Sequence, residues 1–242
     1  MIEIIPAILP TSLDDLRDKM AQVSGFAPLV QIDVCDGKFV PSKSWPYIKG
    51  GMDQFQRINS EGEGFPFWDS LDIEVDLMVR KPEEVVNDWI KAGAKRVVLH
   101  LESAPNILET IEKLREEYGT AKGETYGLEI GVALDIRTPN EKVFEILDLI
   151  DEEGNSIIDF VQFMGIDHVG FQGQEFNDVV LEKISDLRDL YPDIQISVDG
   201  GVNFDNAADL ISAGATRLIS GSAIFESEDI ARAIHDLANA GE

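Results

Sequence analysis

The stretch VQIDVCDGKFVP, from Val30 to Pro41, places two carboxylates at the end of an apolar run. Asp33 and Asp36 lie three residues apart, and Gly37 follows directly. In barrel and doubly wound enzymes, the end of a strand followed by glycine is where reacting groups are kept. Asp and Gly are also ordinary residues of a solvated turn, so this stretch alone favours neither catalysis nor a turn.

Two further aspartates occupy comparable places in the sequence. Asp76 lies late in a predicted strand, and Asp199 ends the predicted strand of ISVDGGV. Carboxylates with a purely structural role normally pair with Lys or Arg or lie away from the mouth of a barrel. Carboxylates that converge instead shift one another's pKa values, and such groups cluster at functional sites. If the ends of these strands meet, Asp33, Asp76 and Asp199 therefore indicate metal binding, acid/base chemistry or both.

Glycine-rich stretches later in the chain have the composition of an anion site. GFQGQEFN covers residues 170–177, and ISGSAIFES covers residues 219–227. Glycine turns let backbone N–H groups approach an anion, and the start of a helix adds a favourable dipole. The residues predicted to bind a phosphate are Gly170, Gln172, Gly173, Gly200, Gly201, Gly221 and Ser222.

The elements that must position these residues alternate between short β-branched runs and longer amphipathic stretches, which is the pattern of an α/β protein. Eight strand and helix units in 242 residues predict a (β/α)8 TIM barrel in a single domain, residues 1–242, with every strand ending on one face. The long segment from Lys38 to Leu71 is predicted to be functional and to contain a short helix around MDQFQRI. The predicted strands are Ile2–Leu9, Leu29–Val34, Ile73–Val79, Arg96–His100, Glu129–Leu134, Ile157–Phe163, Ile194–Val198 and Arg217–Ser220.

Composition excludes several classes of function. Acidic residues exceed basic ones, 46 against 20, which gives a net charge of −26 and makes nucleic acid and anionic membranes poor partners. The single cysteine, Cys35, excludes an internal disulfide framework and a cysteine-rich zinc site. The sequence has no apolar run of membrane-spanning length, and its start lacks a basic leader. A cytoplasmic location is therefore expected.

These stretches together resemble the ribulose-phosphate 3-epimerase family. PAILPTSLDDL is similar to that family's opening segment, QIDVCDGKFVP to its aspartate signature and EVDLMVRKPEE to its Asp-x-His-Leu-Met-Val segment. LHLES, GVALDIRTP, GFQGQEF, VDGGV and GSAIF follow in the family's order. The resemblance covers nearly the whole chain and implies a TIM barrel of the ribulose-phosphate-binding type.

The resemblance also implies an activity. The family's two acid/base aspartates fall on Asp33 and Asp199, which would exchange the C3 proton of a ketopentose phosphate such as D-ribulose 5-phosphate through an enediolate. In the family, those aspartates and two histidines hold a divalent metal, and methionines including the counterpart of Met78 line the substrate. The implied partner is a small phosphorylated sugar, and a homo-oligomer is compatible with this pattern.

This sequence departs from the family at the metal. The two histidine positions are Gln31 and Asp76, so the implied ligand set is Gln31, Asp33, Asp76 and Asp199. Oxygen ligands suit magnesium or manganese rather than zinc, and a proton on one carboxylate is the alternative way to relieve the charge. Further departures are Ala7 for a serine, Cys35 for a methionine, Gln172 for a glycine and Val169 for a proline.

The chain has three histidines that could replace the missing ligands. His235 is expected on the surface of the last helix, and His168 lies in the loop before GFQGQEF. His100 ends the fourth predicted strand and is expected to have a structural role, hydrogen-bonded to Glu102.

Alternatives to the epimerase remain open. A non-catalytic or repurposed barrel that binds a phosphorylated ligand would keep the glycine loops, but it would not need both Asp33 and Asp199. A related sugar-phosphate lyase or isomerase is a further alternative. Decarboxylases and synthases on similar barrels usually carry an Asp-x-Lys-x-x-Asp array, and Lys38 comes after both aspartates of DVCDGK.

Overall fold

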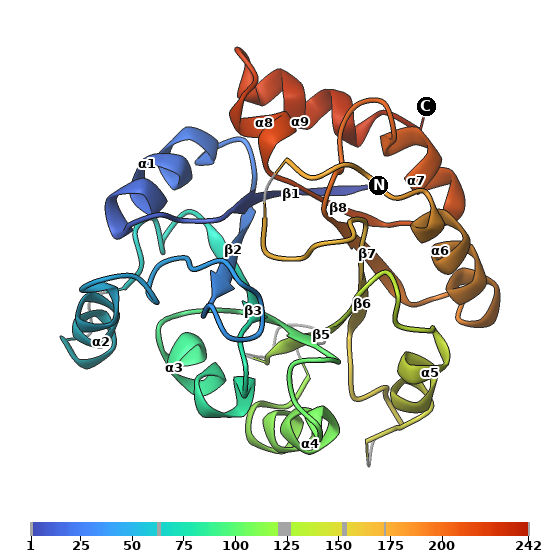
Figure 1. Ribbon diagram of the computed structural model, residues 1–242, viewed down its shortest axis with the longest axis horizontal. Coiled ribbons are helices and arrows are strands. Elements are labelled where there is room, and N and C mark those ends of the chain that lie inside the picture. Colours follow the sequence, from blue (N-terminus) through green and yellow to red (C-terminus); the bar gives the residue numbers. More distant parts are fainter. Residues whose placement is uncertain (1, 62–63, 121–126, 152–153, 172, 242) are drawn as a thin grey trace.

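In the computed structural model, which describes residues 2–61, 64–120, 127–151, 154–171 and 173–241, eight parallel strands close into a barrel in chain order. Figure 1 looks down this barrel, with the strands around the centre and the helices outside them. The predicted (β/α)8 fold is confirmed. The strands are β1 (Glu3–Ile8), β2 (Leu29–Cys35), β3 (Asp72–Met78), β4 (Arg96–His100), β5 (Glu129–Leu134), β6 (Phe160–Met164), β7 (Gln195–Asp199) and β8 (Arg217–Ser220).

The helices follow the strands and cover the outside of the barrel. Local signals explain several of their ends: the Ser12 side chain accepts from Asp15 N at the start of α1, and Gly214 at the end of α7 has a φ of +118°, which favours glycine. The helices are α1 (Leu13–Val23), α2 (Gly51–Glu61), α3 (Val86–Lys91), α4 (Ile107–Tyr118), α5 (Glu141–Leu147), α6 (Val179–Leu190), α7 (Ala207–Ala213), α8 (Ser222–Phe225) and α9 (Ile230–Ala238), with a short 3-10 helix at Pro82–Glu84.

The predicted strand boundaries agree closely with the structure, with one larger difference at β6. The sequence predicted a strand from Ile157, whereas β6 begins at Phe160. Ile157 donates its N–H to Leu149 O at 3.3 Å, beside a bridge between Ile150 and Ser156. The first part of this apolar run therefore pairs with the preceding loop instead of the barrel.

Register between β2 and β3 puts their inward residues into matching layers. Gln31 pairs with Glu74, Asp33 with Asp76, and Cys35 with Met78. Side chains alternate between the two faces of a strand, so residues two apart share a face. Gln31, Asp33 and Cys35 therefore lie on one face of β2, and Glu74, Asp76 and Met78 on one face of β3. From the bottom to the mouth of the barrel, the layers therefore hold Gln31 with Glu74, then Asp33 with Asp76, then Cys35 with Met78.

A buried ion pair involves Glu74 of the bottom layer. The Arg217 guanidinium contacts the Glu74 carboxylate, and the exposed fractions of the two side chains are 1% and 0%. Arg217 also lies 4.0 Å from the centre of the Phe160 ring and donates to Glu3 at 3.1 Å. This pair lies at the opposite end of the barrel from the strand ends that carry Asp33, Asp76 and Asp199.

The long connection after β2 is anchored by aromatic packing. Trp45 makes edge contacts with Phe55 and Trp89 at centroid distances of 5.7 and 6.0 Å. Ser44 ties the same loop to β2, since its hydroxyl donates to Asp33 O at 2.7 Å and accepts from Cys35 N at 2.9 Å. The predicted short helix is present as α2. This loop is thus fixed to the strand that carries Asp33.

Within the described part of the chain, none of the helices combines the length and apolar character that crossing a membrane requires.

Candidate active site

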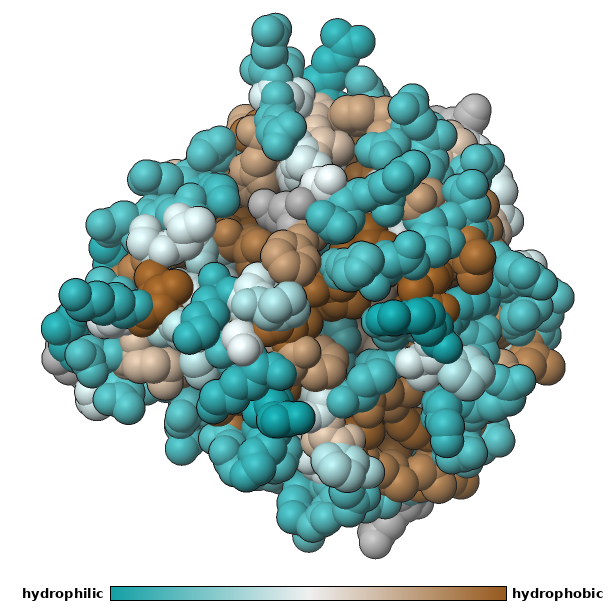
Figure 2. All heavy atoms as spheres, in the orientation of Figure 1, coloured by the Kyte–Doolittle hydropathy of each residue, from teal (hydrophilic) through white to brown (hydrophobic). Residues whose placement is uncertain are grey.

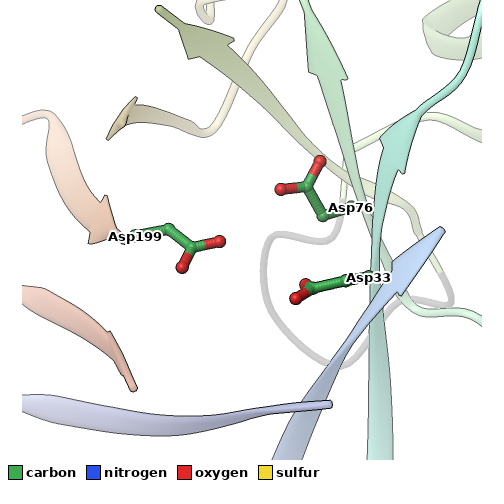
Figure 3. Close-up of side chains that lie close together, drawn as sticks. All are labelled: Asp33, Asp76 and Asp199. Atoms are coloured by element: carbon green, nitrogen blue, oxygen red, sulfur yellow. The ribbon is translucent and has the colours of Figure 1, made fainter. Parts of the chain in front are cut away.

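Three carboxylates converge inside the barrel, near the ends of β2, β3 and β7. Asp33, Asp76 and Asp199 each offer an oxygen, and these oxygens all lie within 4.8 Å of one another. Figure 3 shows Asp33 and Asp76 side by side, pointing across the barrel towards Asp199. The exposed fractions of Asp33, Asp76 and Asp199 are 7%, 0% and 9%. The predicted convergence is therefore observed, while the chemical roles stay predictions.

Gln31 joins two of these carboxylates. Its Nε2 donates to Asp33 Oδ1 at 2.9 Å and to Asp199 Oδ2 at 2.7 Å, and the side chain is fully buried. Its Oε1 has no hydrogen-bond partner within the described residues. The amide thus bridges the carboxylates from opposite sides of the barrel and retains one free acceptor.

Asp76 has a separate set of donors. His100 Nε2 lies 2.9 Å from Asp76 Oδ1, and Gln162 Nε2 donates to Asp76 Oδ2 at 3.1 Å. The expected partner of His100 was wrong. Glu102 instead accepts from Asp135 N at 3.0 Å and from the Thr138 hydroxyl. Register explains the difference, because Asp76 lies on the neighbouring strand whereas Glu102 lies beyond the end of β4.

Burial and mutual repulsion perturb the carboxyl groups. Desolvation raises the pKa of Asp199 to about 7, and the Asp76 charge adds to this shift. Desolvation also raises the pKa of Asp33 well above its ordinary value, with the charges of Asp199 and Asp76 acting in the same direction. Near neutral pH, this pair can therefore hold a proton on one carboxyl while the other is ionised.

The pKa of His100 reflects its carboxylate partner. Burial opposes its charged ring, but the Asp76 carboxylate and its hydrogen bond raise the pKa of His100 above the ordinary value. The ring is 1% exposed and lies 5.3 Å from the Phe39 ring, measured between centroids. The Asp76 carboxylate thus outweighs the effect of burial on the His100 pKa.

Asp36 has a different role from Asp33, although both come from the same stretch. Asp36 Oδ1 accepts from Lys38 N at 2.8 Å and Phe39 N at 2.9 Å, and Oδ2 accepts from Arg80 N at 3.0 Å. These are backbone contacts that shape two loops. Of the two aspartates in the opening motif, Asp36 therefore stabilises the turn and Asp33 faces the barrel interior.

A small pocket connects the carboxylates to the glycine loops. Its volume is about 50 Å³, and Asp33 and Asp199 line it, whereas the fully buried Asp76 does not. Gln172 lies outside the described residues. The remaining residues predicted to contact a phosphorylated substrate all line this pocket: Met78, Gly170, Gly173, Gly200, Gly201, Gly221 and Ser222.

Glycine is required at the turn after β7. Gly200 has a φ of +97° and Gly201 a φ of +72°, which disfavours other residues. A Cβ on Gly201 would also lie 3.0 Å from the Phe176 backbone. The sequence predicted this turn from its glycines.

The wall of sulfur-bearing side chains is more complete than the sequence suggested. Met164 lines the pocket together with Met78, and Cys35 Sγ lies 3.9 Å from Met78 Sδ. Of these methionines, only Met78 was predicted from the sequence; Met164, which pairs in register with Asp199, was not. Its position at the end of an apolar strand was the signal that could have found it.

Two loops pack against the sulfur-bearing wall. Phe39 from the loop after β2 and Val169 from the loop after β6 pack against Cys35, Val40 and Met78. Figure 2 shows apolar residues gathered over the centre of this face, with hydrophilic residues around most of its rim. The pocket of about 50 Å³ is much smaller than the roughly 300–1,000 Å³ of a typical ligand site.

A larger groove, of about 930 Å³, opens beside the pocket between the loops that follow β4, β5 and β6. His168 is exposed in this groove, and His235 is exposed on α9 as expected. None of the three carboxylates lines the groove. His100, which contacts Asp76, lines the groove, so the groove adjoins the carboxylates without containing them.

The donor set fits a divalent cation. The three carboxylates could hold a metal ion, since oxygens at about 2.0–2.6 Å from a hard cation lie within about 4–5 Å of each other. The unpartnered Oε1 of Gln31 could supply a fourth oxygen if the amide turned. None of the described residues that line the pocket is Lys or Arg.

Comparison with known proteins finds a matching family. Residues 3–225 match the "Ribulose-phosphate 3 epimerase family". Ribulose-phosphate 3-epimerase of Bacillus subtilis (strain 168) is 31% identical, over 98% of this chain and 98% of the relative. The chloroplastic ribulose-5-phosphate-3-epimerase of Arabidopsis thaliana is also 31% identical, over 96% of this chain and 75% of the relative.

Solved structures support the fold. A structure of KGPDC from Streptococcus mutans superimposes with a TM-score of 0.66 at 15% identity, over 99% of this chain and 96% of that chain. At an identity this low, the structural similarity shows the barrel architecture alone. The family match and the relatives of similar length carry more, and they show that this chain belongs to the ribulose-phosphate 3-epimerase family, whose members are isomerases.

Proposed function

We propose that this chain catalyses the 3-epimerisation of D-ribulose 5-phosphate, with Asp33 and Asp199 as its acid/base pair. The observation that carries this proposal is that both carboxylates line one pocket from opposite strands, bridged by Gln31 at 2.9 and 2.7 Å. The names of the relatives from Bacillus subtilis and Arabidopsis thaliana support the choice of substrate.

Opposed carboxyl groups suit an inversion at carbon. One carboxylate removes the C3 proton beside the C2 carbonyl, which gives an enediolate, and the other carboxyl returns a proton to the opposite face of C3. The raised pKa values of Asp33 and Asp199 allow one group to be protonated while the other is ionised. The product would be D-xylulose 5-phosphate, and the reverse reaction uses the same groups with their roles exchanged.

The cation that suits this site is magnesium or manganese rather than zinc. Its ligands would be Asp33, Asp76, Asp199 and Gln31, all through oxygen, which hard cations prefer. When bound, such an ion supplies positive charge that stabilises the developing enediolate oxygens. Asp76 would serve as a ligand only, because it does not line the pocket.

The phosphate would bind at the glycine end of the pocket. Gly173, Gly201, Gly221 and Ser222 line it together, and backbone N–H groups at such turns suit an anion. Gly170, Gly200 and Gln172 belong to the same proposed site.

A lyase of the decarboxylase or synthase kind is less well supported. Lys38 is exposed in the loop after β2 and does not line the pocket. A repurposed barrel that only binds a phosphorylated ligand would not need opposed carboxyl groups with raised pKa values. The single-domain organisation over residues 1–242, a cytoplasmic location and a homo-oligomeric state stay predictions.

The test is direct conversion of D-ribulose 5-phosphate to D-xylulose 5-phosphate, followed by NMR with the wild type, Asp33→Asn and Asp199→Asn. Asp18→Asn, at an exposed position on α1, is the matched control. We expect activity in the wild type and control and a loss of about 10²–10⁴-fold in each active-site variant. Ligand binding without turnover in the wild type, with magnesium or manganese present, would instead support the repurposed barrel.

A further inference from the structure

Asp76 is held differently from the other two carboxylates. Each of its oxygens has its own buried donor, His100 Nε2 at 2.9 Å from Oδ1 and Gln162 Nε2 at 3.1 Å from Oδ2. Both donors are almost fully buried, at 1% and 0% exposure. Two separate contacts on one carboxylate fix its plane as well as its position.

The strands leave room for these donors to converge. Ala133 on β5 lies in register between His100 on β4 and Gln162 on β6. A small residue between two long ones lets both side chains reach towards the centre of the barrel. On the other side of Gln162, Ser197 on β7 is the register partner and is also small.

Secondary contacts limit the movement of both donors. The Phe39 ring lies against His100, with centroids 5.3 Å apart, and Gln162 Nε2 lies 3.9 Å from Met164 Sδ. Met164 lines the pocket, whereas Asp76 does not. Gln162 thus lies behind a residue of the pocket wall, and His100 lies between Asp76 and the neighbouring groove, which it lines.

A purely structural explanation accounts poorly for this arrangement. Replacing a buried ion pair with well-packed apolar residues of similar volume is often neutral or stabilising. Here two buried polar side chains instead orient one carboxylate that lies within 4.8 Å of Asp33 and Asp199. Partners that orient ligand side chains commonly change cation affinity or activity about 10–100-fold when they are removed.

We propose that His100 and Gln162 are positioning residues that fix both oxygens of Asp76, so that its carboxylate faces the Asp33 and Asp199 pair. This inference rests on the function proposed above for those two aspartates. Neither His100 nor Gln162 transfers a proton in the reaction. Their effect passes through Asp76 to the cation and to the acid/base pair.

The kinetic test uses His100→Leu and Gln162→Met, which remove one donor each, and His100→Gln, whose amide restores a donor near the position of Nε2. Ser197→Ala is the control, since its hydroxyl is buried and unpartnered within the described residues. We expect kcat to fall about 10–100-fold in the two donor-removing variants, with KM nearly unchanged because the glycine loops are untouched. His100→Gln should recover most of the loss.

Manganese affinity, measured by calorimetry without substrate, provides a readout that does not depend on turnover. We expect the donor-removing variants to bind manganese about 10–100-fold more weakly than the wild type and the control to bind it equally well. Folded donor-removing variants with both kcat and manganese affinity within about twofold of the wild type would overturn the proposal.

A measurement on the wild type decides the proposal if the variants do not fold. With ¹⁵N-labelled histidine, the chain has three rings, and the His100 ring should show a slowly exchanging Nε2–H proton. Absence of that signal would overturn the proposal. Wild-type protein that lacks epimerase activity yet shows the protected proton and donor-dependent manganese binding would contradict the proposed function and support the positioning role.

Discussion

Asp33 and Asp76 are register partners on β2 and β3, so their carboxylates project side by side into the barrel, and Asp199 faces them from β7. Parallel pairing at this position makes their proximity a consequence of the fold. Because the described lining residues of the pocket include no Lys or Arg, protons, neighbouring amides, the His100 ring or a cation must offset the charge.

Stability should depend on pH through Asp199. The pKa of this carboxyl is about 7 in the folded protein against 3.8 ordinarily, so the unfolded chain binds fewer protons between these values. Stability present below about pH 4 is therefore lost as the pH rises towards 7. As the pH rises from 5 to 7 without a cation, the free energy of unfolding of Asp199→Asn should therefore increase by about 1–3 kcal/mol relative to that of the wild type.

Urea unfolding of both proteins in a chelating buffer, at several pH values, measures this difference. A difference that stays constant with pH would contradict the raised pKa of Asp199. Asp18→Asn serves as the control, because it removes an exposed carboxylate and should change little over the same range.

A hard cation should stabilise the fold, and more so at high pH. Protons compete with the ion for Asp33 and Asp199, whose pKa values are raised, so binding should be stronger at pH 8 than at pH 5.5. Manganese or magnesium at about 100 times its Kd should add about 2.7 kcal/mol, and a chelator should remove this increment. Thermal unfolding with each metal measures it, with Asp76→Asn as the variant that should lose most of the effect.

The same thermal-unfolding experiment with zinc tests whether the site prefers a hard cation. An increment from zinc larger than that from manganese or magnesium at equal free concentration would contradict the choice of a hard cation. Equal increments at both pH values would contradict binding by these carboxylates.

The proposed phosphate site can be tested by adding charge. Gly221 lines the pocket with Ser222, and a carboxylate there would repel a sugar phosphate. We expect Gly221→Asp to raise KM at least about tenfold, which corresponds to about 1.4 kcal/mol. The exposed Gln22→Glu on α1 makes the same change in net charge and should leave KM unchanged. Equal KM values for both variants would exclude a phosphate site at Gly221.

At the bottom of the barrel, the buried ion pair should matter for stability alone. Arg217→Met leaves the fully buried Glu74 carboxylate without its partner, and we expect a loss of about 3–5 kcal/mol. The double variant with Glu74→Met should recover much of that loss, because no unpaired charge remains. Urea unfolding compares the three proteins, and a double variant less stable than Arg217→Met would refute this explanation.

The sequence was sufficient for the barrel because each strand is a short apolar run and each run is followed by a helical pattern. It also placed Asp33, Asp76 and Asp199 at strand ends, and those ends meet in the structure. The boundary of β6 was predicted too early, because the apolar residues Ile157 and Ile158 resemble a strand although they precede the barrel pairing.

The hydrogen-bond partners of the site residues could not be predicted from the sequence in the same way. His100 was assigned to nearby Glu102, but strand register gives it Asp76. Gln162 was missed, although a polar residue within the apolar strand FVQFM was an available signal. Asp33 and Asp36 could not be distinguished from their spacing, because only the structure shows which one faces inward and which one binds loop N–H groups.

The central claim is that Asp33 and Asp199 exchange the proton at C3, and isotope incorporation tests it most directly. D-Ribulose 5-phosphate is incubated with the protein and manganese or magnesium in D₂O, and the C3 proton is followed by NMR. We expect D-xylulose 5-phosphate with deuterium at C3 from the wild type, and neither product nor exchange from the double variant Asp33→Asn/Asp199→Asn. Product that retains protium at C3, exchange at C1 alone, or wild-type turnover by the double variant would contradict the claim.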